Sequence, residues 1–381
     1  MASPKPAIYD PVMGTREGPP RTTLLLPGVG SLLGRCLLDS LQGRRQHITV
    51  VGGDADVSAP ALDECDVSIA LPPTDTPGFA TAVDRACIKH GVDLVIPCRD
   101  PDNEILASAR AVPESAIRLA GPTGDLVSMT RDKWRSYQWC SKRGIPFAPT
   151  VSTDSSAARA ELNMLIAEWS FPLIAKPARG SGSLGVTVLI DDSHLRAVLA
   201  TPGLVVQPFL SPPSPESLRM DVSRGVPLFW EVPCDNETGI MALIGPQGEI
   251  GPRLCFSAQH RMGRNESLWT VGDPELDEFA DDVLPTLVAH GMRGPINLQV
   301  RRGRDGWRII EINARFTGGT AARLLMGLDE VGWIMNSWIG GEVVPKFGRD
   351  AVPRVVRPFR ELPVRGSTPR GGGADSRVAC L

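Results

Sequence analysis

Residues 307–315 read Trp-Arg-Ile-Ile-Glu-Ile-Asn-Ala-Arg, and residues 297–300, one turn upstream, read Asn-Leu-Gln-Val. Their alternation of apolar and polar residues predicts two strands joined by a turn at 302–306. In such a hairpin Glu311 and Asn313 point to one face, with Gln299 beside them. Carboxylate and amide oxygens are donors that Mg²⁺ prefers, and it completes its shell with water and substrate phosphates. The pattern therefore predicts a magnesium site of the kind used in nucleotide chemistry.

Size and composition favour a globular protein of two or three packed units. The chain has 381 residues, 42% of them hydrophobic, and a net charge of −3, so it lacks the basic excess of a nucleic-acid-binding protein. Its eight cysteines show no zinc spacing, which favours a reducing cytoplasm. Pro27, Arg35 and Asp39 interrupt the apolar segment 24–41, and we expect neither a membrane span nor an export signal.

The N-terminal third has the pattern of a small doubly wound parallel sheet. Apolar strands are expected at 22–26, 47–51 and 93–97, and helices at 32–41 and 80–89. After a helix expected at 133–142, strands and hairpins dominate, so a domain boundary is placed near residue 125. Residues 1–21 and 346–381 are rich in Pro, Gly or Arg without periodicity and are expected to be flexible.

A glycine-rich segment follows the apolar strand 171–175 and Lys176, with glycines at 180, 182 and 185. Gly-x-Gly-x-x-Gly normally opens a helix, but here the β-branched run 186–190 follows. The segment is therefore predicted to be a flap between antiparallel strands, whose amides close over phosphates while Lys176 adds a positive charge. The alternative is an ordinary glycine-rich hairpin with a surface lysine.

A first glycine cluster, Gly28, Gly30 and Gly34, lies between an expected strand and helix, with Asp54 at the end of the next strand. This context suits a dinucleotide-binding loop, although the last spacing is one residue longer than usual. A tight strand-to-helix turn explains the same glycines. Both interpretations remain open from the sequence.

Several motifs in order resemble the ATP-grasp superfamily, especially its short, carbamoyl-phosphate-synthase-like branch. They are Lys133 in Thr-Arg-Asp-Lys-Trp, Gly144-Ile145-Pro146, Lys176-Pro177 with its glycines, Val205-Val206-Gln207-Pro208-Phe209-Leu210, and the 297–315 hairpin. The resemblance covers about residues 22–345. It implies an α/β and α+β fold: a Rossmann-like pre-ATP-grasp domain at 22–125, a small lobe with the glycine flap at 126–200, and a large lobe with the metal site at 201–345.

The resemblance also implies site residues. The nucleotide-binding positions would be Lys133, Lys176, Gly180, Ser181, Gly182, Ser183, Gly185, Gln207, Pro208, Phe209, Leu210 and Glu216. Gln299, Glu311 and Asn313 match metal ligands, and Arg315 with Lys176 matches the catalytic cations. The chain departs from the family at Gln299, where many members have glutamate, and at Pro208, where an acidic residue is common; a proline-rich insertion also precedes Glu216.

Two further segments are candidate substrate contacts. Residues 259–266 are polar and cation-rich, and His260, Arg261 and Arg264 would bind a carboxylate or simply lie in a solvated loop. Gly318 and Gly319 would offer backbone amides to a substrate, or begin a helix at about residue 321. For Glu311, the alternative to a metal ligand is a strand carboxylate paired with a nearby arginine.

The function implied by the resemblance is ATP-dependent, ADP-forming ligation of a small carboxylic acid, such as an amino acid, to an amine through an acyl phosphate. ATP and one or two Mg²⁺ ions, or Mn²⁺, would be required. Partners would be small molecules, and a homodimer is common in the superfamily. The alternatives are a carbamoyl-phosphate-forming or kinase-like phosphoryl transferase, a non-catalytic nucleotide-binding module, which Gln299 would favour, and a nicotinamide-dependent oxidoreductase.

Overall fold

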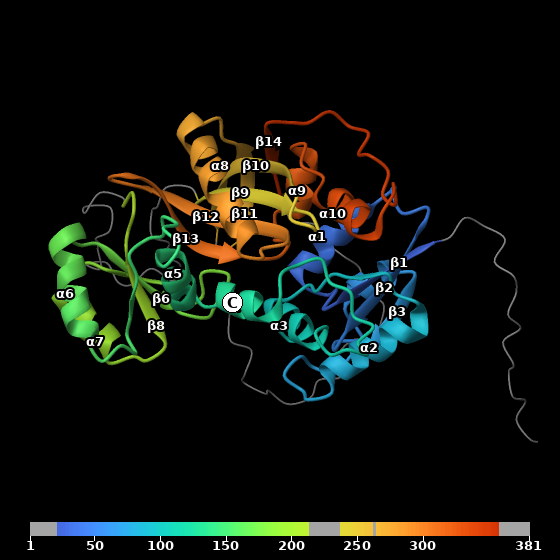
Figure 1. The fold of residues 1–381 in the computed structure, drawn as a ribbon, viewed down its shortest axis with the longest axis horizontal. Coiled ribbons are helices and arrows are strands. Elements are labelled where there is room, and N and C mark those ends of the chain that lie inside the picture. Colours follow the sequence, from blue (N-terminus) through green and yellow to red (C-terminus); the bar gives the residue numbers. More distant parts are fainter. Residues whose placement is uncertain (1–20, 213–236, 262–263, 358–381) are drawn as a thin grey trace, which may run out of the picture.

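The computed structural model describes residues 21–212, 237–261 and 264–357, and Figure 1 shows their arrangement. Within these ranges the strands form three sheets. The N-terminal sheet (blue) and the small sheet (green) lie at opposite ends of the molecule in this view, and the six-stranded sheet (yellow to orange) lies between and above them. None of the described helices combines the length and apolar composition needed to cross a lipid bilayer.

The N-terminal sheet is parallel, in the order β3-β2-β1-β4, as the alternating pattern predicted. Helix α1 has the predicted bounds, whereas β3 and the helices α3 and α4 were not predicted. Its elements are β1 (Thr22–Pro27), α1 (Leu32–Leu41), β2 (Ile48–Asp54), the 3₁₀ helix η1 (Pro60–Glu64), β3 (Val67–Ala70), α2 (Phe79–His90), β4 (Leu94–Val95), α3 (Asp100–Ala109) and α4 (Gly124–Thr130).

The small sheet is antiparallel, in the order β5-β8-β6-β7. The glycine-rich segment joins β6 to β7, so the predicted pair of antiparallel strands around it is confirmed. The elements of this region are α5 (Lys133–Ser141), β5 (Val151–Ser152), α6 (Ala158–Trp169), β6 (Leu173–Pro177), β7 (Thr187–Leu189), α7 (Asp192–Leu199) and β8 (Leu204–Pro208).

The six-stranded sheet has the order β13-β12-β9-β10-β11-β14. Its elements are β9 (Glu237–Ile244), β10 (Ile250–Arg261), β11 (Arg264–Thr270), α8 (Pro274–Ala289), β12 (Gly294–Gly303), β13 (Gly306–Asn313), α9 (Thr320–Leu325), α10 (Glu330–Ile339) and β14 (Arg354–Val356). The prediction of a flexible tail from residue 346 is wrong for β14, because this strand pairs with β11 at Ser267–Trp269. Edge pairing of backbone groups orders a segment that lacks a strand-like side-chain pattern.

The N-terminal sheet and the six-stranded sheet share one hydrophobic core. Leu24 and Leu26 of β1 belong to the same buried cluster as Met241 and Leu243 of β9 and Ile334 of α10. Burial of apolar surface is the main favourable term in folding, so this common core holds the two sheets in a defined relative position. Residues from both sheets can therefore contribute to one site.

The first glycine cluster forms a tight turn from β1 into α1. The amide of Gly30 donates to Asp54 Oδ2 at 2.8 Å, and Ser31 caps α1 by accepting from the Gly34 amide at 3.2 Å. Arg99 Nη2 donates to both oxygens of the same Asp54 carboxylate, at 2.7 and 2.8 Å. The turn and Asp54 therefore satisfy one another, which supports the structural interpretation of these glycines.

We predict that Gly34→Ala strongly destabilises the protein. A Cβ at Gly34 would lie 2.1 Å from the carbonyl oxygen of Val29, a backbone atom that cannot move aside without shifting the turn. We expect a loss of about 2 kcal/mol or more in the free energy of unfolding, measured by urea denaturation. Gly78→Ala is the matched control, because a Cβ there meets no atom within 4 Å. Equal stability of both variants would contradict the close approach.

Candidate nucleotide and metal site

The β12–β13 hairpin has the register expected from its sequence. Gln299 pairs with Glu311, and Asn297 pairs with Asn313. Glu311 and Asn313 lie on the same face, because Asn313 Nδ2 donates to Glu311 Oε1 at 3.4 Å. The structure thus brings the three proposed metal ligands together, as the alternation predicted.

Lys133 connects three elements at this face. It is the first residue of α5, and its ammonium lies 3.3 Å from Glu311 Oε2 and donates to the carbonyl of Gly180 at 3.1 Å. Its backbone amide donates to the carbonyl of Ala178 at 2.9 Å. The buried Lys133 side chain therefore holds the start of the glycine-rich segment against β13.

Lys176, on β6, reaches the same strand from the small sheet. Its ammonium donates to the carbonyl of Ile310 at 3.2 Å, and the residue is buried. Burial lowers the pKa of Lys176 to about 8; the Lys133 charge acts in the same direction and Glu311 opposes it. Among its described contacts the lysine has no ion pair with a carboxylate.

Arg315 follows β13 and is held by a residue of the N-terminal sheet domain. Its guanidinium forms an ion pair with Asp100, the first residue of α3, and Nη2 donates to Asn313 Oδ1 at 3.3 Å. Burial disfavours the ionised form of Asp100, but the charge and hydrogen bond of Arg315, together with the charges of Arg131 and Lys133, outweigh burial, so the pKa of Asp100 is lowered. Asn103 of α3 adds a bond from Nδ2 to the carbonyl of Ala314 at 3.3 Å.

Glu104 provides another carboxylate on α3, directed toward Arg131 and Arg179. It pairs with Arg131 and with Arg179, whose Nη2 donates to its two oxygens at 2.6 and 2.8 Å. Arg179 immediately precedes Gly180. Helix α3 is thus linked both to Arg315 and to the base of the glycine-rich segment.

The glycine-rich segment itself is an exposed turn. Gly182 and Gly185 have φ values of +65° and +72°, which favour glycine, and Ser183 shares this conformation at +59°. All residues from 180 to 185 are exposed to solvent, including Ser181. An exposed turn with few contacts to the body is able to move over a bound phosphate, and this role stays a prediction.

Several hydrogen-bonding groups of the predicted adenine hinge already bond to neighbouring residues of the small-sheet region. Gln207 is buried and its Nε2 donates to Thr150 Oγ1 at 2.9 Å. The amide of Phe209 donates to the carbonyl of Pro172 at 3.2 Å, and that of Leu210 to the carbonyl of Pro208 at 3.0 Å. The hinge contacts to a nucleotide therefore remain a prediction, and Glu216 lies outside the described residues.

Glu237 is a site residue that the sequence analysis missed. It begins β9, and its Oε2 lies 3.7 Å from Nε2 of His260 on β10. Burial raises the pKa of Glu237, with Glu311 acting in the same direction and His260, Arg301 and Lys176 opposing. The only sequence signal was an acidic residue opening an apolar strand, which is common at strand ends.

The candidate substrate contacts fall into separate groups in the structure. His260 joins the cluster through Glu237, whereas Arg261 and Arg264 pair at the end of the β10–β11 hairpin and their side chains lie outside the described part of the chain. The Gly318 carbonyl accepts from Cys36 Sγ at 3.2 Å, and the Gly319 amide donates to Thr317 Oγ1 at 3.3 Å. Gly319 is also the N-cap of α9, which supports the structural interpretation of these glycines.

The donor set fits a magnesium ion. One carboxylate and two amide groups lie on one hairpin face, and the second carboxylate of Glu237 is close enough to raise the cluster's negative potential. In the described structure, the ammonium of Lys133 forms an ion pair with Glu311. Hard oxygen donors with few protein ligands are what Mg²⁺ bound to nucleotide phosphates requires.

Comparison with known proteins supports the fold. The model of the PylC-like N-terminal domain matches residues 35–116. The structure superposes on N5-carboxyaminoimidazole synthetase from Staphylococcus aureus with a TM-score of 0.63 and 12% identity, covering 88% of this chain and 81% of that one. The chain has the ATP-grasp fold. The biotin carboxylase domain of 2-oxoglutarate carboxylase from Hydrogenobacter thermophilus, solved with MgADP, ADP and bicarbonate, gives a TM-score of 0.62 at 15% identity, over 85% and 71% of the chains.

The curated relatives match this chain only in part. D-alanine–D-alanine ligase A from Chromobacterium violaceum is 26% identical over 189 residues, which is 43% of this chain and 50% of the ligase. The chain spans smaller shares of the other curated relatives that it resembles. These likenesses establish the fold, and the activity has to be argued from the site.

We predict that nucleotide affinity falls as the pH rises from 7 to 9. The ammonium form of Lys176 is largely populated below its pKa of about 8 and is lost above it, so the positive charge offered to phosphate disappears over this range. The dissociation constant of ADP with Mg²⁺ should rise about tenfold, measured by calorimetry.

The control for this prediction is Lys176→Arg, whose guanidinium stays charged throughout. Its affinity should change little over the same range. If the wild type and Lys176→Arg show the same pH dependence, Lys176 is not the titrating group.

Proposed function

We propose that this protein is an ATP-dependent, ADP-forming ligase that joins a small carboxylic acid to an amine. The observation that carries the proposal is the meeting of Lys133, Lys176 and Arg315 at the hairpin that bears Glu311 and Asn313. Phosphoryl transfer needs positioning and positive charge more than covalent help, and this cluster offers both. The partial relative D-alanine–D-alanine ligase supports an amino acid as the carboxylic acid.

Each cation has a distinct place in this proposal. Lys133 and Lys176 bind the nucleotide phosphates beneath the glycine-rich turn, and Gln299, Glu311 and Asn313 hold Mg²⁺, which when bound offsets the charge of the phosphate oxygens. Arg315 faces the transferred phosphoryl group and is kept in place by Asp100. The turn at 180–185 excludes water when it closes.

The proposed reaction has two steps. A carboxylate oxygen of the acid attacks the γ-phosphorus of ATP, the bond to the β–γ bridging oxygen breaks, and ADP leaves. The amine nitrogen then attacks the acyl carbon, inorganic phosphate leaves with the former carboxylate oxygen, and the amine loses a proton. The product is lighter by one water than the acid and amine together.

A nucleotide-binding module without catalysis is the second candidate. Gln299 favours it, because an amide supplies no negative charge to a metal ion where a glutamate would. Glu237, half-buried at the start of β9, adds a second carboxylate that interacts electrostatically with Glu311 and so favours the enzyme. Carboxylates dominate the binding of hard divalent ions.

The deciding experiment measures ADP and phosphate release from ATP and Mg²⁺ with pooled carboxylic acids and amines, followed by mass spectrometry of each active pool. A ligase requires both an acid and an amine and yields the dehydrated product. Release with the acid alone, together with a stable phosphorylated product, would identify a kinase-like enzyme. ATP binding without release in any pool would leave the binding module as the function.

We predict that Glu311→Ala and Lys176→Ala each abolish turnover while the fold persists. Glu311 and Lys176 would act on the phosphates and their metal, so each loss should reduce turnover about 100-fold or more. The measurement is ADP release, with circular dichroism as the folding check. Glu278→Ala and Lys142→Ala, at exposed positions, are matched controls that should keep activity. Full activity in Glu311→Ala or Lys176→Ala would refute the site assignment.

We predict that Asp100→Asn lowers kcat about 10- to 100-fold with little change in the KM for ATP. Asp100 touches no substrate in this proposal and acts by orienting Arg315, so it is a positioning residue. Asp100→Glu should restore part of kcat, because it restores the ion pair. A variant that melts earlier but retains its kcat would show that the ion pair is only structural.

A further inference from the structure

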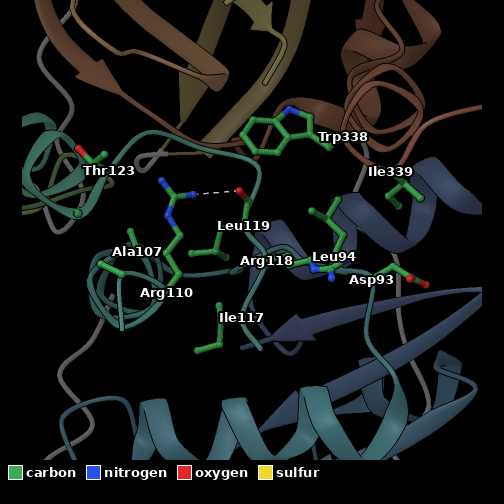
Figure 2. Close-up of a pocket in the computed structure, with 12 residues that line it drawn as sticks. Asp93, Leu94, Ala107, Arg110, Ile117, Arg118, Leu119, Thr123, Trp338 and Ile339 are labelled. Carbon is green, nitrogen blue, oxygen red and sulfur yellow. Dashed lines mark hydrogen bonds between the residues drawn. The ribbon is translucent and has the colours of Figure 1, made fainter. Parts of the chain in front are cut away.

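A cavity of about 590 Å³ lies between the N-terminal sheet domain and α10, and none of the candidate nucleotide-site residues lines it. It is bounded by the end of α3, the segment 117–119 and α10, as Figure 2 shows. Its volume falls within the range of small-molecule sites. The proposed ligase mechanism uses none of its lining residues.

Arg110, which caps the C-terminus of α3, lines this cavity. Its guanidinium donates to the carbonyl of Leu119 at 3.0 Å, to that of Gly121 at 3.1 Å and to that of Pro122. Across the described ranges, no carboxylate pairs with it, and burial lowers the pKa of Arg110. The carbonyls orient the guanidinium but leave its positive charge without a counter-charge, which is costly for a partly buried ion.

A second arginine of the lining has unused hydrogen-bonding capacity. Arg118 is exposed, and in the described part of the chain its side chain forms neither a hydrogen bond nor an ion pair. The ring of Trp338 lines the cavity, and its enclosed indole nitrogen, which has no partner among the described residues, lies on the ring edge away from Arg110 (Figure 2). Asp93 is an acidic residue on the same wall, and its Oδ2 already accepts from the amide of Thr23 at 2.8 Å.

The remaining wall is apolar. Leu94, Ile117 and Leu119 are buried side chains of the lining, and Ile339 of α10 completes it (Figure 2). A site of this composition matches a molecule with one anionic group and an apolar body. Apolar walls bury the body, and a few placed polar groups set the orientation.

We propose that this cavity is a ligand site, which binds a small organic anion with its charged group at Arg110 and its apolar body against Leu119 and Trp338, while Arg118 adds positive charge on the wall. It is separate from the nucleotide site. Asp100, which holds Arg315, begins α3, and Arg110 follows its last residue, so the two sites lie about 15 Å apart along the helix.

The test uses the full chain saturated with ADP and Mg²⁺ and the fluorescent anion 8-anilinonaphthalene-1-sulfonate as probe. We expect one probe molecule to bind per chain despite the nucleotide. Benzoate should displace the probe, and its neutral isostere benzamide should not. None of these readouts depends on turnover, so the result stands apart from the ligase proposal.

Variants assign the binding to this cavity. Arg118→Gln should weaken probe binding about threefold, because a positive charge on the cavity wall is lost. Ala111→Phe, at an exposed lining position, should weaken it further, because the added ring occupies part of the cavity. Arg85→Gln, an exposed arginine on α2 outside the lining, is the matched control and should bind normally.

Three results would overturn the proposal: displacement of the probe by ADP, equal displacement by benzamide, and wild-type affinity in both Arg118→Gln and Ala111→Phe. If Ala111→Phe melts at a lower temperature than the wild type, the Arg118→Gln result alone decides. The Arg118 side chain is exposed and forms no bond within the described structure, so its replacement should not unfold the protein.

Discussion

Two buried ammonium groups beside one strand constrain the whole site. Lys133 comes from α5 and Lys176 from β6, yet both reach β13, where Glu311 and the carbonyl of Ile310 receive them. Moving a charged group out of water costs several kcal/mol unless partners compensate for it. The small sheet, α5 and the hairpin must therefore stay together. Lys133 contacts the Glu311 carboxylate, whereas Lys176 contacts only a backbone carbonyl among the described residues, so its ammonium forms no ion pair with a carboxylate there.

Helix α3 extends this constraint to the N-terminal sheet. Asp100 and Glu104 lie one turn apart on α3, and they pair with Arg315 on one side and with Arg131 and Arg179 on the other. The core shared by β1, β9 and α10 fixes the position from which these carboxylates act. The N-terminal domain is thus part of the site's electrostatics, which explains how a charge 215 residues away in sequence orients Arg315.

Much of the fold followed from local pattern. The hairpin register, the bounds of α1 and the antiparallel strands around the glycine-rich segment agree with the sequence analysis. Elements without a strong local pattern were not predicted. Strand β14 is ordered by pairing with β11, and β3 is short and only half-buried, so neither shows strong periodicity. Glu237 begins a strand with an acidic residue, which by itself is unremarkable.

The sequence by itself determined which oxygen donors share a face. Alternation along a strand is a property of the backbone, so Glu311 and Asn313 had to point the same way. It also supplied the lysines and the glycine-rich turn. Only the tertiary structure decided the partners: Lys133 with Glu311, Asp100 with Arg315, and Glu237 beside His260. Contacts between distant charges depend on how sheets pack, and on a shared core that no short stretch of sequence encodes.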